Sequence, residues 1–367
     1  MKVKPLLNLL LPSLLLMPLP GKACSSLAIT DSSGHVFHGR TLELSEDLPS
    51  WLTYYPKGTA FQKKAPDGSN AASYQALYPV LSVTTEVYQD GDDHNMLEGV
   101  NGAGLSFSAN MVPEANLTPL TKDEYKISVP VTSIGEWALA NFATVEEVRE
   151  AVKKGHFWSP VLTRLGGVKS PFHFAFYDKK GGSIVVEALN GTFHVYDNPT
   201  KVMTNGPDFP WHLQNLNNYT QLTNKDRSEA VLGTLKLVQP DSGIAAEALP
   251  SSDTSVGRFI RGVYYTTYAP VAKSTGDSFN VLAHIMNRFD RMKNITTDTL
   301  GGESTIKTGK TLSEYTVWTS LTDLSDGIML IRGYSDIGYK KFSLEAFHDV
   351  KKPVFERIND ANTALSY

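Results

Sequence analysis

The chain has 367 residues, of which 41% are hydrophobic and 20% charged, and it carries a formal charge of -4 with a pI near 6.2. This composition is typical of a soluble globular protein. The mild acidity provides no basic surface for a polyanion, so nucleic acid is not an expected partner. After residue 23 no apolar run reaches the ~20 residues that a membrane-spanning helix needs, so we expect no stable membrane insertion.

The first 23 residues have the pattern of a secretory leader. Two lysines near the start precede a leucine-rich stretch over 6–19, and Gly21 and Ala23 supply the small residues of a cleavage site. We therefore predict a signal peptide over 1–23 and a single domain over 24–367, exported by a bacterium to its periplasm or secreted.

Cys24 is the only cysteine, and cleavage after Ala23 would place a free α-amine on the same residue. Thiols in exported proteins usually pair, so a lone one points to chemistry. Two other interpretations stay open. A lipoprotein signal would attach lipid to Cys24, although Gly21 and Lys22 are unusual before such a site. In an uncut chain, Cys24 would be a buried structural residue.

Residue patterns in the first half of the chain predict mostly strands. In chain order these are strands at 26–29 and 36–39 around a turn at 31–34, a polar loop at 62–75, a β-rich segment at 78–88, two strands within 97–112 around a glycine turn, a helix at 131–141, and a helix at 145–154 that begins at a Thr-Val-Glu-Glu capping box and stops at Gly155.

The second half alternates between strands and helices without regular βαβ units. The pattern predicts a hairpin over 173–188, strands at 193–196 and 201–204, helices at 211–219, 227–237, 255–268 and 278–292, and a hairpin of strands 315–321 and 328–333. This order favours an α+β layered domain with antiparallel sheets.

An N-terminal cysteine nucleophile needs a base, a cation near the thiol and a donor for the oxyanion. An α-amine, with an ordinary pKa of about 7.7–8.0, can serve as the base. Candidates for the other tasks are Arg40, Asn205 and Arg258, each in a short block of glycine or turn residues. Taken singly, each of these is more simply a solvated arginine or a turn residue.

Together the blocks resemble the choloylglycine hydrolase family of N-terminal nucleophile hydrolases, which contains bile salt hydrolases and penicillin V acylases. The similar blocks are the Cys-Ser-Ser start and those at 39–43, 98–105, 139–148, 185–187, 202–212 and 257–261. The resemblance implies a four-layer αββα sandwich, a homo-oligomer such as a homotetramer, and hydrolysis of a linear carboxamide through an acyl-thioester.

The resemblance also implies roles for individual residues. Cys24 would be the nucleophile and its amine the base, while Arg40 and Arg258 flank the thiol. Asn205 would donate its side-chain amide to the oxyanion, and Glu43 would hold the α-amine, although the family usually has Asp there. The second oxyanion donor is placed at Asn110, although direct counting gives Met111, and a backbone amide is the alternative.

The implied substrate is a small N-acyl amide, and no cofactor or metal is needed. His35, His38, His94, His173 and His212 show no metal-ligand spacing. Trp51, Leu52, Tyr54 and Tyr55 are candidates for an apolar substrate pocket, or ordinary core residues.

The resemblance leaves several substrates and origins open. The export signal and the Arg-Thr-Leu-Glu block at 40–43 favour a penicillin V acylase or N-acyl homoserine lactone acylase. Bile salt hydrolysis is the alternative, and a non-catalytic lipoprotein that binds an apolar ligand is the rival class. A eukaryotic lysosomal relative also stays open, because Asn116, Asn190, Asn218 and Asn294 each begin an Asn-x-Thr sequon.

Overall fold

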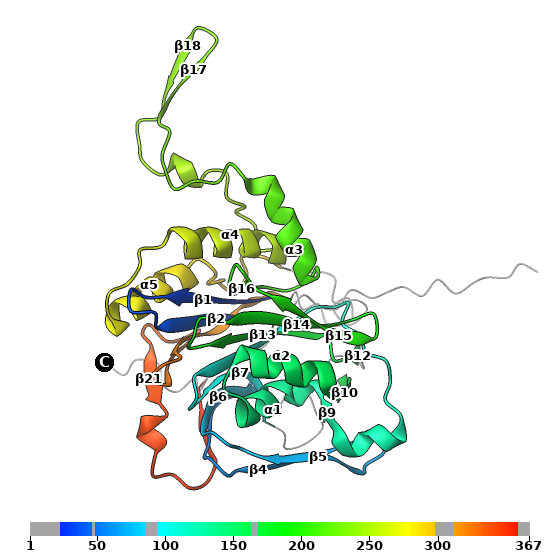
Figure 1. Ribbon diagram of the computed structural model, residues 1–367. Helices are drawn as coiled ribbons and strands as arrows, with labels where there is room; N and C mark the ends of the chain where they lie inside the picture. Colours follow the sequence, from blue (N-terminus) through cyan, green and yellow to red (C-terminus); the bar gives the residue numbers. More distant parts are fainter. Residues whose placement is uncertain (1–22, 46–47, 86–93, 163–167, 298–311, 359–367) are drawn as a thin grey trace, which may run out of the picture.

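The computed structural model describes residues 23–45, 48–85, 94–162, 168–297 and 312–358. Two antiparallel sheets stack face to face in this part of the chain (Figure 1). The predicted signal peptide, apart from Ala23, lies outside the described residues.

The first sheet has six strands in the order β16 (Val202–Met203), β1 (Cys24–Thr30), β2 (Val36–Leu44), β19 (Tyr315–Asp323), β20 (Ile328–Gly333) and β21 (Lys340–Ser343). The second has eight, in the order β15 (Thr192–Asp197), β14 (Ser183–Leu189), β13 (Phe172–Asp178), β8 (Leu105–Met111), β7 (Asn95–Asn101), β6 (Val80–Thr85), β3 (Ser50–Tyr55) and β22 (Val354–Arg357).

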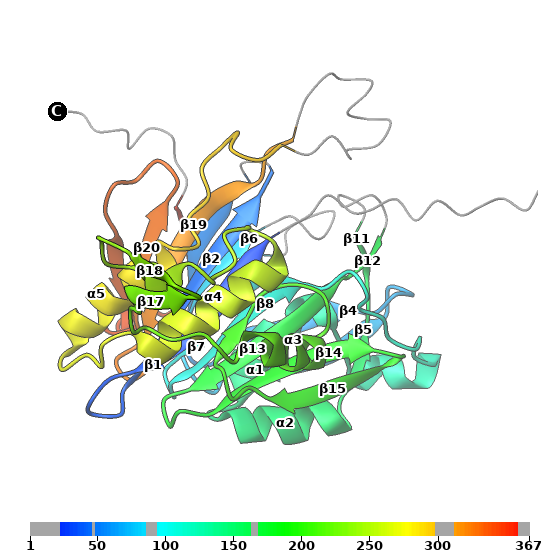
Figure 2. The same cartoon turned by 90° about the horizontal axis from the view of Figure 1, so that it is seen from above.

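Helices cover the outer face of each sheet (Figures 1 and 2). Helices α4 (Ser255–Tyr268) and α5 (Thr275–Met286) pack on β1, β2, β16 and β19, whereas α1 (Ile134–Asn141) and α2 (Val145–Lys154) pack on the eight-stranded sheet. The resulting layer order, helix–sheet–sheet–helix, is the expected four-layer sandwich. Helix α3 (Phe209–Asn215) follows β16.

Smaller elements complete the described chain. The two-stranded pairs are β4 (Ala60–Lys64) with β5 (Asn70–Gln75), β9 (Ser128–Pro130) with β10 (His156–Trp158), β11 (Val161–Leu162) with β12 (Val168–Lys169), and β17 (Glu229–Leu232) with β18 (Leu235–Val238). The short 3-10 helices are 122–127, 131–133, 216–219, 244–246 and 345–347. Within the described ranges, no helix is long and apolar enough to cross a bilayer.

Helix α2 forms where its capping box predicts it. The Thr144 hydroxyl accepts a bond from the Glu147 backbone N–H at 3.3 Å, and the Glu147 carboxylate accepts one from the Thr144 N–H at 3.1 Å. Both bonds satisfy amides that the first helical turn leaves unpaired. Val148 and Val152 then bury one face of the helix against the sheet.

Two predicted elements are wrong. The polar segment 62–75 forms the hairpin β4–β5 rather than a loop, because Phe61 and Ala71 bury one face of a strand pair whose other positions are largely exposed. The segment 227–237 forms the hairpin β17–β18 rather than a helix. There Gly233, with φ of 61°, closes a two-residue turn that a helix cannot contain.

Helix α5 begins and ends earlier than its predicted range of 278–292. The Ser274 hydroxyl accepts a bond from the Asp277 N–H at 3.2 Å and so caps the helix. The predicted range is based on apolar spacing alone and does not include this capping residue. The predicted apolar stripe is nevertheless buried, including Leu282 on the helix and Phe289 beyond its end.

Polar residues occupy part of the layer between the two sheets. On β8, Ser106, Ser108 and Asn110 face the six-stranded sheet, where the first two contact the His38 ring from β2 at 3.2 and 3.1 Å. Phe107, between them, packs on the Phe174 and Phe176 rings. Strand alternation therefore directs the polar side chains of β8 inward, toward the strand that begins with Cys24.

Candidate active site

Cys24 is the first residue of β1, and only 2% of its surface is exposed. In the uncut chain its nitrogen is a peptide N–H, which donates to the Asn205 Oδ1 at 2.7 Å. After cleavage the α-amine would occupy this position. Strand pairing aligns Cys24 with Leu42 on β2, so a regular sheet fixes both the nitrogen and the sulfur.

Arg40 approaches the Cys24 sulfur from β2. Its Nη2 lies 3.8 Å from the Sγ and donates to the Ala109 carbonyl at 2.5 Å, while its Nη1 donates to the Leu97 carbonyl. The guanidinium is fully buried and lies over the Trp318 ring, with 5.3 Å from its carbon to the ring centroid. A fixed cation at this distance favours the thiolate form of Cys24.

Arg258 reaches Cys24 from α4, in the helix layer. Its Nη1 donates to the Cys24 carbonyl and, at 2.8 Å, to the Ser25 hydroxyl, and its Nη2 donates to the Asn205 Oδ1 at 2.7 Å. The family resemblance predicts both arginines beside the thiol, and in the structure Arg40 makes the hydrogen-bond contact with the sulfur. Arg258 holds the backbone of Cys24 and the side chain of Asn205.

Asn205 follows β16 and contacts Cys24 through its side-chain oxygen. Because that oxygen accepts from two N–H donors, the amide nitrogen is directed to the other side, where it donates to the Met111 carbonyl at 3.0 Å. An amide carries two hydrogens, so one is available for an oxyanion. The Asn205 backbone is fixed in turn by Ser255 at 2.9 Å and by His212 at 2.8 Å.

Glu43 is buried on β2, one residue beyond the partner of Cys24. Its backbone N–H donates to the Ala23 carbonyl at 2.9 Å, and its Oε1 accepts from the Thr316 hydroxyl at 3.1 Å. Burial raises the pKa of Glu43 to about 7, although the Arg258 charge opposes the shift. Among the described residues, its Oε2 has no hydrogen-bond partner. The role expected for Glu43, to hold a released α-amine, stays a prediction.

Asn110 also lies against Cys24, because strand alternation turns its side chain inward. Its Nδ2 is 3.5 Å from the Cys24 carbonyl and donates to the Thr204 carbonyl at 2.7 Å. Met111, the residue given by direct counting, contributes only its carbonyl, to Asn205.

Burial raises the pKa of the Cys24 thiol above its ordinary value. The Arg40 charge opposes this shift most strongly, the Glu43 charge adds to it, and Arg258 opposes it to a smaller extent. Formation of the thiolate therefore needs a base, and the predicted base is an α-amine on Cys24.

The residues predicted to bind substrate lie on β3, which β6 and β7 separate from β8. Tyr54 stacks on Phe347 with 4.8 Å between ring centroids, Tyr55 packs edge-on against Phe61, and Trp51 against His94. Leu52 is 1% exposed. These contacts describe core packing at the other edge of the sheet, so a substrate role for Trp51, Tyr54 and Tyr55 stays a prediction.

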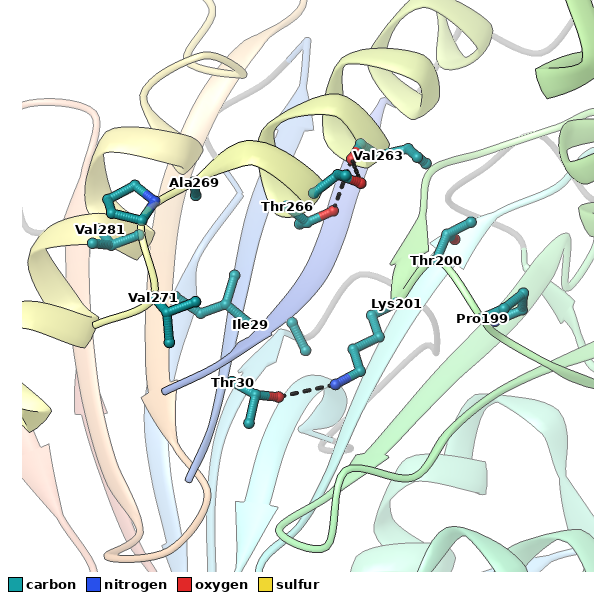
Figure 3. A pocket seen from close by; sticks show the side chains of 13 residues that line it. Ile29, Thr30, Pro199, Thr200, Lys201, Val263, Thr266, Ala269, Val271 and Val281 are labelled. Atoms are coloured by element: carbon teal, nitrogen blue, oxygen red, sulfur yellow. Dashed lines mark hydrogen bonds between the residues drawn. The ribbon is translucent and has the colours of Figure 1, made fainter. Parts of the chain in front are cut away.

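A cavity of about 360 Å³ lies at the opposite end of β1 from Cys24 (Figure 3). Ile29, Val263 and Val271 form part of its wall, and the Lys201 ammonium donates to the Thr30 hydroxyl at 2.9 Å. None of the predicted catalytic residues lines it. This cavity is therefore separate from the Cys24 cluster.

Within the described ranges, no group of three or more His, Cys, Asp and Glu side chains is placed to hold a metal ion. His38 contacts serine hydroxyls, and burial lowers its pKa to about 3. His212 donates to the Asn205 carbonyl, and burial lowers its pKa to about 4. Both rings therefore act as neutral hydrogen-bonding groups.

Sequence reasoning missed Glu98, which lies inside a block used only for its resemblance. Glu98 projects from β7 across the sheet interface, where it contacts the Ser320 hydroxyl and lies 3.9 Å from the Arg40 Nε. Ser320 is the register partner of Arg40, so the carboxylate enters between two neighbouring strands. No local pattern in the sequence indicates a contact that depends on the stacking of two sheets.

The chain is similar to several known proteins over much of its length. A family model described as linear amide C-N hydrolases, choloylglycine hydrolase family, matches residues 24–354. The bile salt hydrolase/transferase of Clostridium perfringens is 28% identical over 316 residues, covering 85% of this chain and 90% of that protein. The penicillin V acylase of Pectobacterium atrosepticum is 25% identical over 253 residues, covering 66% of this chain and 59% of that protein.

A solved structure shares the fold. A variant of the conjugated bile acid hydrolase from Clostridium perfringens superposes with a TM-score of 0.77 at 24% identity, covering 92% of this chain and 97% of that one. The two stacked sheets and their outer helices thus form the same αββα sandwich as that structure. The match to the family model covers nearly all of the chain after Ala23, so this protein belongs to the choloylglycine hydrolase family of linear amide C–N hydrolases.

Proposed function

We propose that Cys24, released as the first residue by removal of 1–23, is the nucleophile of this hydrolase. The observation that carries the proposal is the setting of its two reactive atoms. The nitrogen is 2.7 Å from the Asn205 Oδ1 and the sulfur is 3.8 Å from the Arg40 Nη2. The family match also begins at Cys24.

In the proposed reaction, the Cys24 sulfur attacks the carbonyl carbon of an N-acyl amide while its proton passes to the α-amine. Asn205 stabilises the oxyanion with its second amide hydrogen. Asn110 is the proposed second donor to the same oxyanion. The C–N bond then breaks, and the leaving nitrogen takes the proton from the α-amine. Water hydrolyses the acyl-thioester, which releases the carboxylic acid and restores the thiol.

The acyl-thioester is the intermediate to detect. After mature protein is mixed with substrate and quenched in acid, the intact mass should be increased by one acyl group. Peptide mapping should then locate that group on the peptide that begins with Cys24. A variant with alanine inserted before Cys24 is the matched control, because it keeps the thiol but replaces the α-amine by a peptide bond. Full turnover by that variant would refute the role of the amine.

Two substrate classes follow from different observations. The sequence blocks favour a penicillin V acylase or acyl homoserine lactone acylase, whereas the bile salt hydrolase relative is more similar over a larger part of the chain. We propose that the substrate has an apolar acyl group in both cases. Turnover of glycocholate, penicillin V and a long-chain acyl homoserine lactone by one preparation, compared by kcat/KM, separates the two classes.

Export, oligomer formation and lipidation are tested on the same material. We propose cleavage after Ala23 in a bacterial cell envelope, and N-terminal mass spectrometry should find an unmodified Cys24. A diacylglycerol-modified cysteine would instead support the lipoprotein. We also propose a homotetramer, which light scattering of the mature protein should report as four times the monomer mass.

A further inference from the structure

Asn110, His173 and Glu187 form a row of side chains across three neighbouring strands. Asn110 on β8 is the register partner of His173 on β13, which is the partner of Glu187 on β14. Their exposed fractions are 0%, 1% and 0%. The mechanism above uses only Asn110, so a buried imidazole and a buried carboxylate beside the site have no assigned task.

Both ring nitrogens of His173 face hydrogen-bond acceptors. The Nδ1 lies 2.8 Å from the Glu187 Oε1, and the Nε2 lies 3.0 Å from the Thr204 carbonyl oxygen. A ring that donates from both nitrogens is the charged imidazolium. Glu187 is its counter-ion, and both carboxylate oxygens also accept from the Phe209 N–H at 3.0 Å.

The His173 ring therefore connects α3 and the eight-stranded sheet to the segment that carries Asn205. The Thr204 carbonyl accepts from the His173 Nε2 and also from the Asn110 Nδ2, at 2.7 Å. This carbonyl belongs to the peptide group whose nitrogen is that of Asn205. Two donors from neighbouring strands thus fix the peptide plane from which the Asn205 side chain extends to Cys24.

We propose that the His173–Glu187 ion pair is a positioning device that sets the Asn205 amide for the oxyanion. The inference deepens the proposed function, on which it rests. A charged donor holds a carbonyl more firmly than a neutral one, and the Glu187 carboxylate, 2.8 Å from the Nδ1, fixes the orientation of the ring. An error of about 1 Å in a catalytic group can reduce the rate about 100-fold.

Two substitutions of His173 separate positioning from packing. Asparagine places its amide near the position of Nδ1, so His173→Asn keeps a partner for Glu187 and loses the donor to Thr204. Glutamine extends to the position of Nε2, so His173→Gln keeps that donor. Both remove the ring and its charge, and each is therefore the packing control for the other.

The readouts are kcat for amide hydrolysis and the rate of Cys24 alkylation by iodoacetamide. Alkylation needs the thiolate but no oxyanion donor. We expect His173→Asn to lower kcat about tenfold or more, and His173→Gln to lower it only about threefold, because glutamine keeps the donor to Thr204 but not its charge. Alkylation rates should be the same in all three proteins.

Equal kcat values in the two variants would overturn the proposal, as would a parallel loss of alkylation and hydrolysis. If His173→Asn does not fold, Glu187→Gln takes its place, with an expected drop in kcat of about threefold or more and unchanged alkylation; parental kcat there overturns the proposal. A parent protein that forms no acyl-thioester would instead mark failure of the proposed function, because that result does not depend on His173.

Discussion

Two buried arginines contact Cys24 from different layers of the sandwich, and each has a buried glutamate within its electrostatic range. Arg40 and Glu98 lie between the two sheets, with 3.9 Å between the Nε and the Oε2, and Arg40 contacts the sulfur. Arg258 extends from the helix layer, contacts the Cys24 carbonyl and acts electrostatically on Glu43. Two guanidinium groups therefore contact different atoms of Cys24, one its sulfur and the other its carbonyl oxygen.

This difference indicates a division of tasks. The pair between the sheets is placed to set the charge state of the thiol. Arg258, on α4, is placed to hold the Cys24 carbonyl and the Asn205 side chain. Because both pairs are buried, loss of one partner leaves the other as an uncompensated charge, and stability must be measured alongside chemistry.

The largest effect is expected from replacing Cys24, the residue that both pairs surround. Cys24→Ser should lower amide turnover about 1,000-fold or more, because a hydroxyl is far harder to deprotonate than a thiol near neutral pH. Steady-state kinetics on the mature variant measure this, with circular dichroism to verify the fold. Turnover equal to that of the parent would exclude Cys24 as the nucleophile.

Next in size is the contrast between the arginines. Arg40→Gln should raise the thiol pKa and slow alkylation at pH 7 by about 10- to 100-fold, because it removes the cation in contact with sulfur. Arg258→Gln should change alkylation less. The pH profile of iodoacetamide alkylation measures both variants. A larger effect from Arg258 would reverse the assignment made from the contacts.

A smaller effect concerns Glu98 and pH. Burial raises the pKa of Glu98 to about 7 from an ordinary value of 4.5, although Arg40 opposes the shift. The folded state therefore binds more protons between these values, and the free energy of unfolding falls as pH rises through this window. In Glu98→Gln, the free energy of unfolding should decrease by about 2 kcal/mol less than in the parent over the same pH window.

Urea unfolding of the parent and of Glu98→Gln at pH 5 and pH 8 measures this change. The comparison uses the difference in slope with pH, because the variant also leaves Arg40 without its counter-ion. Identical slopes would show that Glu98 ionises alike in the folded and unfolded chains.

The smallest effect is expected far from both pairs. Thr144→Ala removes the cap of α2 and should cost about 1 kcal/mol of unfolding free energy. Because α2 packs on the far face of the eight-stranded sheet, alkylation of Cys24 should not change. Chemical denaturation and the alkylation rate test this together. A changed alkylation rate would mean that thiol reactivity follows global stability, which would weaken every comparison above.

Local signals were sufficient for much of the fold. The capping box at Thr144 placed α2, and the glycine turn at 102–104 placed β7 and β8, because these signals act within a few residues. They failed at 227–237, where β17 and β18 are exposed throughout and no buried stripe exists to support a helix. They also failed at 62–75, where polar composition concealed a strand pair.

The sequence by itself determined the lone cysteine, the order of most strands and helices, and the resemblance that assembled the candidate residues into one site; the leader before that cysteine stays a prediction. Only the tertiary structure decided which atom each residue contacts. The reason is physical, because Arg40, Glu98, His173 and Arg258 meet their partners across sheets and layers from distant parts of the chain. Such contacts depend on register and stacking, which no short segment encodes.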